Sequence, residues 1–474
     1  MLINCNYKIS LLEKPEKHSK SPIIKSAFGL TNQTLVRTII DNIDVFVEGI
    51  TYVTGYSGTG KSTLLKSVSK KMNNSSYLSP PQETGIPIID LMGEDISKSM
   101  GFLNYVGLGE AYVYLTPYSN LSDGQKFRFQ LAYALIKEPE FLIIDEFLSN
   151  VDRISAKIVS FNFQKICRKM KVKAIIATTH EDLIEAIAPD QLIRLDFNGK
   201  YHLEYKPVHP RIAELDSLQA SIGTIADYES LKCYHYADNM PTIEIADQYN
   251  VEAYTVKYKN NCIAIAMLQS PYPKDWNDIP YFRDINQNIL ISNGTIVHPS
   301  FRGAGLTKKI YEFAHADIFK KGIKCISAHS AMSRFFPYKR GSGYTEITHP
   351  SEIKSKQQAL LENYLYELNI SDLTNIHSYD FCEKIVNSLN YTQKTELKSL
   401  AMNAYSEKLL SINAYLRKLS DLPLLTVNQS KELKDIFMEA ISELSLTDML
   451  QDTAFFPMRG VYLKKADYET KGGK

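Results

Sequence analysis

Residues 50–63 read ITYVTGYSGTGKST, an apolar run followed by a glycine-rich turn and by residues that begin a predicted helix. Four of them match the pattern G-x-x-x-x-G-K-S: Gly55, Gly60, Lys61 and Ser62. In this pattern the glycines let backbone N–H groups surround phosphate oxygens, and the helix N-terminus favours an anion. The lysine bridges the outer phosphates and the serine hydroxyl holds magnesium. The stretch therefore predicts a nucleotide-binding loop between a buried strand and a helix.

Further polar motifs follow other apolar runs. The run Phe141–Ile144 ends in two carboxylates, where Asp145 is expected to hold magnesium and Glu146 to polarise the attacking water. The sequence LSDGQ at residues 121–125 opens a helix whose N–H groups would face the γ-phosphate bound by a second molecule. His180 follows the apolar run KAIIATT and is expected to sense the same phosphate. Together the motifs predict hydrolysis of a bound nucleotide.

The combined set resembles the ABC-type ATPases over about residues 25–200. The resemblance assigns a role to each motif: Gly55–Thr63 is the Walker A loop, Ser122–Gln125 the signature, Asp145 with Glu146 the Walker B pair, Asp152 part of the D-loop and His180 the switch histidine. The residues that it assigns to ATP binding are Phe28, Gly55, Ser57, Gly58, Gly60, Lys61, Ser62, Thr63, Gln82, Ser122, Asp123, Gly124, Gln125, Asp145 and Asp152. The expected Mg²⁺ ligands are Ser62, Gln82 and Asp145, and the expected catalytic residues of hydrolysis are Glu146 and His180.

Several positions in this part admit two interpretations. Phe28 lies 33 residues before Lys61, where the family stacks an aromatic ring on adenine, but a strand aromatic in the core fits equally well. Gln82 is either the Q-loop residue or a surface-loop glutamine. Asp123 replaces the usual glycine of the signature; a carboxylate caps a helix well but is unfavourable close to a phosphate. Ser122 comes only 61 positions after Lys61, so the lobe that docks on membrane subunits in transporters should be trimmed.

The resemblance also implies an assembly. In this family the Walker A loop of one molecule and the signature of its partner enclose each ATP. A single cassette therefore needs a second copy, most simply in a head-to-tail homodimer with two-fold symmetry. ATP is expected to close the dimer and hydrolysis to open it, because the closed state binds ATP more tightly.

A second motif lies in NILISNGTIVHPSFRGAGLTKKIYEFAHA, which predicts a strand, a tight turn and a helix. The turn Arg302–Gly305 lets backbone N–H groups approach a pyrophosphate at a helix N-terminus. It resembles motif A of the GNAT acyltransferases, in which the turn grips the pyrophosphate of acetyl-CoA or another acyl-CoA and the preceding strand bonds the pantetheine arm. The resemblance spans about residues 220–348 and assigns acyl-CoA binding to Thr295, Ile296, Val297, Arg302, Gly303, Ala304, Gly305, Leu306 and Thr307. Thr307 departs from the family's Gly or Ala, and an ordinary glycine-rich turn is the alternative.

Three residues are candidates for the acyl-transfer chemistry. His235 and Tyr236 stand in LKCYHYADNMP, and an imidazole and a phenol are suited to proton transfer from an amine. A capped core helix explains that stretch equally well. Tyr338 is a candidate general acid for the leaving thiolate, although a tyrosine of the surface or the core fits its spacing better.

Composition limits the class of protein. The 474 residues have a net charge of +1, so any nucleic-acid face must be local. The N-terminus has no signal-peptide layout and no apolar run is long enough for a membrane span. The six cysteines form no CxxC pair, which fits a reduced, cytoplasmic protein. We expect an α/β chain in three parts: an ATPase domain (1–205), a GNAT-like domain (206–350), and a mostly helical C-terminal extension (351–474), possibly completing the GNAT domain.

The two halves together resemble ABC ATPases that are fused to a GNAT-like domain, and three hypotheses follow. In the first, an ATP-gated clamp holds a nucleic acid while the GNAT-like domain acylates an amino group on it. In the second, an ATP-driven nucleic-acid clamp has a decayed GNAT-like domain that only docks. In the third, the acceptor is a protein or a small amine. The nucleic-acid substrate is inferred by analogy with the fused proteins that the chain resembles, and no residue of the chain indicates it directly.

Overall fold

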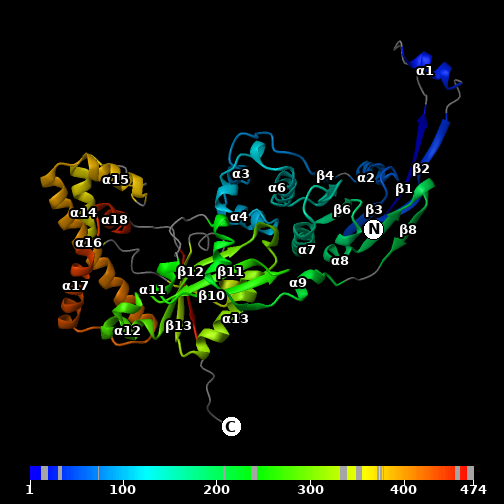
Figure 1. Ribbon diagram of the computed structural model, residues 1–474. Coiled ribbons are helices and arrows are strands. Elements are labelled where there is room, and N and C mark those ends of the chain that lie inside the picture. Colours follow the sequence, from blue (N-terminus) through cyan, green and yellow to red (C-terminus); the bar gives the residue numbers. More distant parts are fainter. Residues whose placement is uncertain are drawn as a thin grey trace, which may run out of the picture. The chain divides into compact units, whose positions relative to one another are not determined.

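The computed structural model describes the chain except for residues 12–19, 30–34, 73, 206–208, 236–242, 331–338, 348–354, 371–372, 374–375, 377, 454–459 and 467–474. Its contacts divide the chain into two units. Figure 1 labels helices and strands of both units. The first comprises Met1–Leu218 and Val297–Leu306, and the second comprises Gln219–Ile296 and Thr307–Lys474. The chain after residue 350 therefore groups with the second unit instead of forming a third one.

A six-stranded sheet forms the centre of the first unit. Its order is β4-β5-β6-β3-β7-β8, in which β8 runs antiparallel to β7 and the other pairs are parallel. The strands are β3 (Ile50–Gly55), β4 (Ser75–Tyr77), β5 (Phe141–Ile144), β6 (Lys173–Ala177), β7 (Gln191–Leu195) and β8 (Tyr201–Glu204). Strands β3, β5 and β6 are buried almost throughout, as their continuous apolar runs predict.

Helices that follow β3 in the first unit lie between these strands along the chain, except α9 (Ala213–Asp216), which follows β8. The longer ones are α2 (Lys61–Ser69), α4 (Ile96–Tyr105), α6 (Asp123–Leu135) and α7 (Arg153–Met170). The shorter ones are α3 (Ile88–Leu91), α5 (Ala111–Tyr114), α8 (Ile184–Ile187) and α9 (Ala213–Asp216). Helix α2 follows β3 and α7 links β5 to β6, so the loops at the carboxyl ends of the strands precede helix N-termini, where phosphate groups bind readily.

An antiparallel hairpin lies at the start of the chain. Strands β1 (Leu2–Leu11) and β2 (Leu35–Phe46) pair from Leu2↔Phe46 to Leu11↔Leu35. The short helix α1 (Ser21–Ala27) belongs to the connection between them, and Figure 1 shows it in blue beyond the end of the hairpin. This connection is long. The number of residues between two positions on either side of it therefore does not predict where they lie along the strands.

A seven-stranded sheet forms the second unit. Its order is β14-β15-β13-β12-β11-β10-β9. The strands are β9 (Ala220–Ile222), β10 (Glu252–Tyr258), β11 (Asn261–Gln269), β12 (Ile289–Val297), β13 (Cys325–Ser330), β14 (Thr345–Ile347) and β15 (Gly460–Lys465). Strands β10 and β11 form an antiparallel hairpin, and β12 and β13 are parallel neighbours linked through α13 (Leu306–Lys320). The final strand β15 pairs with both β13 and β14, so the end of the chain completes this sheet.

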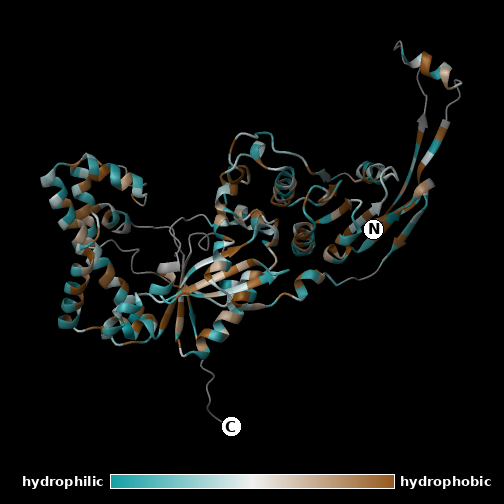
Figure 2. Cartoon of the chain, viewed as in Figure 1, coloured by the Kyte–Doolittle hydropathy of each residue, from teal (hydrophilic) through white to brown (hydrophobic). Residues whose placement is uncertain are grey.

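Helices surround a second apolar core in this unit. They are α10 (Ile225–Glu229), α11 (Ile243–Gln248), α12 (Pro280–Asn286), α14 (Lys356–Glu367), α15 (Tyr379–Ser388), α16 (Tyr391–Leu419), α17 (Val427–Ser442) and α18 (Leu446–Thr453). Phe282 of α12 packs on Phe437 of α17, and the buried Cys325 of β13 belongs to the same cluster. Figure 2 shows apolar residues along the strands of this sheet. Among the described residues, none of the helices is long and apolar enough to cross a membrane.

Candidate functional site

The glycine-rich loop joins β3 to α2 through backbone angles that favour glycine. Gly55, Gly58 and Gly60 have φ values of 142°, 80° and 99°. A Cβ atom on Gly55 would lie 2.2 Å from the carbonyl oxygen of Leu195, so the neighbouring strand β7 also requires a glycine there. The loop therefore leads directly into the N-terminus of α2, whose first N–H groups have no partner within the helix. This is the arrangement expected of a phosphate site.

Lys61 holds this loop together. Its Nζ donates hydrogen bonds to the carbonyl oxygens of Gly55 (2.8 Å) and Tyr56 (2.9 Å), and the residue is 6% exposed. Burial lowers the pKa of its ammonium, while the nearby Glu146 and Asp145 oppose that shift. Because its partners are neutral carbonyls of the loop, the ammonium is well placed to turn to the outer phosphates of ATP.

The two Walker B carboxylates follow β5, as predicted. Glu146 lies next to the loop with φ of 52°, and its Oε2 accepts a hydrogen bond from the Ser149 hydroxyl (3.0 Å). The backbone N–H of Glu146 donates to Asp145 Oδ1 (3.1 Å), which fixes the first carboxylate beside the second. Asp145 and Ser62 supply oxygen atoms of the kind that Mg²⁺ prefers.

His180 lies after β6, half-buried. Its carbonyl oxygen accepts a hydrogen bond from the Tyr52 hydroxyl, and its backbone N–H donates to the Thr178 hydroxyl (3.4 Å). Burial and the nearby Arg153 guanidinium lower the pKa of His180. The imidazole is therefore neutral at pH 7, so it has both a donor and an acceptor nitrogen for a phosphate and a water.

A hollow of about 670 Å³ opens beside the Walker A loop. It is lined by Tyr7, Ile9, Ile39, Ser57, Gly58, Gly60, Lys61, Ser62, Thr63, Lys66, Ser67, Ser69, Lys70, Tyr77 and Glu146. The lining combines a cationic, glycine-rich floor for phosphates with apolar and aromatic side chains for a base. These residues fit ATP with its magnesium ion.

Phe28 does not line this hollow. It caps the C-terminus of α1 and is 75% exposed, whereas Tyr7 of β1 lies in the wall of the hollow. The count of 33 residues back from Lys61 crosses the long β1–β2 connection, which moves Phe28 off the strands. Gln82 lies exposed in the loop after β4 and is also absent from the lining. A pattern of spacing alone could not have selected Tyr7.

The signature and the D-loop meet at a second hollow. Ser122 caps α6: its hydroxyl accepts from the Gln125 N–H (3.3 Å) while Gln125 Oε1 accepts from the Ser122 N–H (2.9 Å). Asp152 caps α7 by accepting from the Ser155 N–H (3.0 Å). This hollow is lined by Ser122, Asp123, Gly124, Arg128, Asn150, Val151 and Asp152. The exposed Asp123 lies in the first turn of α6, where a carboxylate suits the helix dipole.

The predicted acyl-CoA turn follows β12. Thr295, Ile296 and Val297 end that strand, and Leu306 and Thr307 begin α13. Gly303 and Gly305 have φ values of 84° and 74°, and Ala304 lies between them with its N–H bonded to the Phe301 carbonyl (3.2 Å). The pairing of β12 with β13 is recorded from Ile289↔Cys325 to Ser292↔Ala328, and β12 runs on to Val297.

The acyl-transfer candidates are only partly described. His235 follows the short helix Lys232–Tyr234 and is half-buried. Tyr236 and Tyr338 lie outside the described residues. Next to Tyr338 in the chain, Lys339 is 2% exposed; its Nζ donates to Ser292 Oγ (3.0 Å) and to the Tyr311 hydroxyl. Sequence analysis missed this buried lysine because nothing local marks it.

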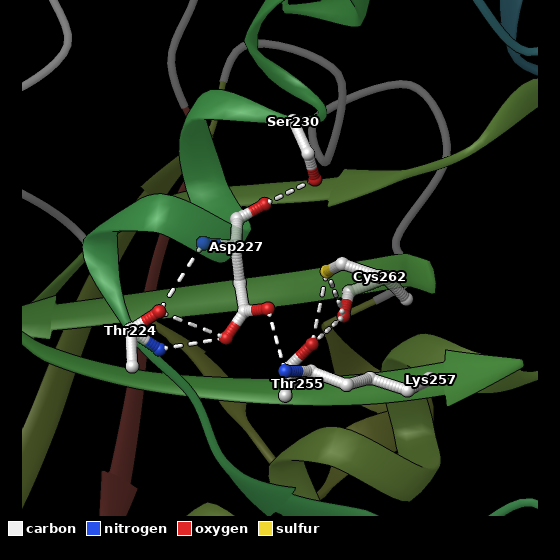
Figure 3. Close-up of polar contacts among 7 residues, drawn as sticks. Thr224, Asp227, Ser230, Thr255, Lys257 and Cys262 are labelled. Carbon is white, nitrogen blue, oxygen red and sulfur yellow. Dashed lines mark hydrogen bonds and ion pairs between the residues drawn. The ribbon is translucent and has the colours of Figure 1, made fainter. Parts of the chain in front are cut away.

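Polar contacts anchor the short helix α10 (Figure 3). Asp227 of α10 and Thr224 form a capping box, and the Lys257 ammonium of β10 lies 2.7 Å from Asp227 Oδ1. The Thr255 hydroxyl and the Cys262 thiol are 2.9 Å apart beside them. Although burial raises the pKa of Asp227, hydrogen bonds from Lys257 and Thr224 bring it below its ordinary value. The cluster fixes α10 against β10.

A P-loop between a parallel strand and a helix, with two carboxylates and a histidine at neighbouring strands, defines a nucleotide-hydrolysing ATPase. No protein-family model matches the chain. The aliphatic sulfonates import ATP-binding protein SsuB 1 of Agrobacterium fabrum is 30% identical over 233 residues, which cover 42% of this chain and 81% of that protein. The phosphonates import ATP-binding protein PhnC 1 of Trichodesmium erythraeum is 38% identical over 85 residues, 18% of this chain and 33% of that protein.

Part of the chain is also similar to solved structures of ATP-binding cassettes. The ADP conformation of an ATP-binding cassette of an ABC transporter has 16% identity and a TM-score of 0.30, covering 36% of this chain and 86% of that one. CbiO1 from Clostridium perfringens has 21% identity and a TM-score of 0.30, covering 36% and 82%. On the sequence similarity and its coverage, the chain belongs to the ABC ATPases. It therefore has an ATP-binding cassette that hydrolyses ATP.

Proposed function

We propose that the chain couples its ABC ATPase to acyl-CoA-dependent N-acylation of a nucleic acid. The observation that supports the acyl-CoA part best is the end of the pairing between β12 and β13, which comes before the end of β12. Within the described part of the chain, the pairing of β12 with the parallel β13 extends to Ser292, five residues before Val297. Backbone groups beyond Ser292 would hydrogen-bond an extended pantetheine arm, in the manner of an added strand.

The turn after β12 suits the other end of an acyl-CoA. Gly303 and Gly305 adopt left-handed angles, and the 15-residue helix α13 begins directly after them. Successive N–H groups in such a turn, together with the helix dipole, favour a pyrophosphate. His235 is a candidate proton acceptor from the attacking amine, and Tyr338 a candidate proton donor to the leaving thiolate.

Transfer would form a bond between the acyl carbonyl carbon and the acceptor nitrogen. It would break the thioester bond between that carbon and the sulfur of CoA. The amine loses a proton to a general base, and the thiolate leaves as CoA after protonation. A base amino group within a duplex must first leave the stack, which a clamp would assist. The resemblance to fused ABC–GNAT proteins supports the nucleic-acid acceptor.

The ATPase is proposed to work as a head-to-tail homodimer. The hollow at Walker A and the hollow at the signature have different linings within one chain. A partner's signature placed over Lys61 would complete each ATP site, and two-fold symmetry completes both at once. Closure on ATP would clamp the nucleic acid.

Transfer of labelled acetyl groups tests this function. The full chain is incubated with isotope-labelled acetyl-CoA, ATP and either DNA or RNA, and digested nucleosides are analysed by mass spectrometry. A nucleoside heavier by one labelled acetyl group, absent without ATP, is the expected product. Label on protein or polyamines alone would favour the third hypothesis, and binding of DNA without any label would favour the decayed clamp.

A further inference from the structure

The acyl-CoA turn belongs to the ATPase unit by its contacts. Val297–Leu306 groups with Met1–Leu218, although the chain on either side belongs to the other unit. The Ser155 hydroxyl of α7 donates to the carbonyl oxygen of Ser300 (3.2 Å). A Cβ atom on Gly303 would lie 2.6 Å from Asn162 Nδ2, so the turn is packed closely on α7.

Within this segment, Arg302 pairs with a carboxylate of the ATPase lobe. Its Nη1 lies 2.5 Å from Glu110 Oε2, and the two side chains are 13% and 22% exposed. Its Nε also donates to the carbonyl oxygen of Val297 (3.1 Å). A guanidinium in this position would meet the pyrophosphate of an acyl-CoA bound at the turn. Glu110 and that pyrophosphate therefore compete for one cation, because two anions beside it repel each other.

The same contacts lead to the nucleotide machinery. Arg128 of the signature helix α6 donates through Nη1 to the carbonyl oxygen of Gly107 (3.2 Å) and through Nε to that of Gly124 (3.3 Å). A Cβ atom on Gly107 would lie 3.7 Å from the carbonyl oxygen of Arg302. A movement of the signature helix would therefore displace Gly107, whose backbone lies next to the carbonyl group of Arg302.

The D-loop provides a second route. Asp152 caps the first turn of α7 by accepting from the Ser155 N–H, and the Ser155 hydroxyl holds the Ser300 carbonyl. The signature and the D-loop are the two elements that would face the partner's ATP in the proposed dimer. Both are therefore one or two contacts away from the turn.

We propose that Glu110 is an electrostatic latch on Arg302 that keeps the acyl-CoA turn closed until ATP binding moves the signature helix and the D-loop. The ligand of the turn rests on the function proposed above, whereas the latch itself is independent of that ligand. Coupling between two ligands is reciprocal, so acyl-CoA would also raise the affinity of the closed dimer for ATP. Acylation would then begin only after a substrate has been clamped.

The test uses the full chain with Glu146→Gln, which is expected to keep ATP bound. Hydrogen exchange of residues 297–306 is followed by mass spectrometry with and without MgATP, in the absence of acyl-CoA. Acetyl-CoA affinity is then measured by calorimetry under the same two conditions. Glu110→Gln removes the charge with little change of shape, and Glu94→Gln, an exposed carboxylate in the same lobe, is the control.

MgATP should accelerate exchange in residues 297–306 and tighten acetyl-CoA binding about tenfold. Glu110→Gln should show the fast exchange and the tighter binding without ATP, while Glu94→Gln behaves as the parent. Ser155→Ala should weaken the response to ATP, which provides a second test if Glu110→Gln folds poorly. Exchange that is unaffected by ATP, or that Glu110→Gln leaves unchanged, overturns the latch. An exchange response without any acetyl-CoA binding upholds the latch and contradicts the acyl-CoA assignment instead.

Discussion

The backbone of Gly124 touches the carbonyl oxygen of Asn150: a Cβ atom on residue 124 would lie only 2.8 Å from that oxygen. The signature helix and the D-loop therefore meet backbone to backbone. Any side chain at position 124 must push the two apart, and both elements face the partner's nucleotide in the proposed dimer.

Gly124→Ala should abolish most ATP hydrolysis and leave ATP binding to the monomer intact. The added methyl group displaces the signature from the D-loop at a cost of about 1–3 kcal/mol, while the Walker A loop keeps its shape. Steady-state ATPase assays and calorimetry separate the two effects. Gly101→Ala is the control, because residue 101 lies within α4 with no atom near its Cβ position. Equal ATPase activity in both variants contradicts the role given to this contact.

Glu146→Gln should slow hydrolysis by about a hundredfold or more and accumulate an ATP-bound dimer. The amide cannot accept the proton of the attacking water, whereas its shape still fits beside Ser149. Light scattering with MgATP measures the mass of the species formed. Glu83→Gln, exposed in the loop after β4, should remain like the wild type. A variant that stays monomeric with ATP bound is evidence against the sandwich.

Tyr7→Ala should weaken ATP binding about tenfold, and Phe28→Ala should leave it unchanged. Stacking of a base on an aromatic ring is worth about 1–3 kcal/mol, and Tyr7 is the one of the two that lines the hollow. Equilibrium titration with a fluorescent ATP analogue gives both dissociation constants. If Phe28→Ala weakened ATP binding and Tyr7→Ala did not, Phe28 would be the residue that contacts adenine.

Asp227→Asn should destabilise the second unit by about 1 kcal/mol near neutral pH, because the capping box of α10 loses its carboxylate. The pKa of Asp227 is below its ordinary value, so its contribution is present above the unfolded-state pKa of about 3.9 and is lost as the pH falls further. The difference from wild type should therefore shrink below about pH 4.

Urea unfolding followed by tryptophan fluorescence measures this effect, since Trp276 is the single tryptophan of the chain and lies in the second unit. Glu229→Gln on the same helix is the control, because Glu229 forms a long ion pair with Lys232 (3.8 Å) and is not part of the capping box. A difference that stays constant from pH 7 to pH 3 rules out the charged form of Asp227 as the source.

Local motifs made much of this architecture predictable. The P-loop, the start of α6 and the carboxylates after β5 depend on neighbours within a few residues, so their sequence patterns determine their geometry. The cap of α6 differs from the expectation: Ser122 is the cap, and Asp123 lies in the first turn. Tyr7 lines the hollow and Phe28 does not, and spacing could not indicate this because a long connection separates Tyr7 from Lys61. The Arg302–Glu110 pair joins residues 192 positions apart, and no sequence pattern marks such a contact. The place of β15 between β13 and β14 likewise depends on the whole sheet.

Calorimetry of acetyl-CoA binding to the full chain tests the proposed coupling of ATPase and acyl transfer most directly. The wild type is compared with Gly305→Glu and with Gly322→Glu, whose glycines both have positive φ values (74° and 95°) and open space at the Cβ position. Both substitutions should strain the backbone alike, but only Gly305→Glu places a carboxylate in the pyrophosphate turn. We predict binding to the wild type and to Gly322→Glu, and none to Gly305→Glu. Equal affinity in all three, or no binding to the wild type with or without ATP, would contradict an acyl-CoA site at this turn.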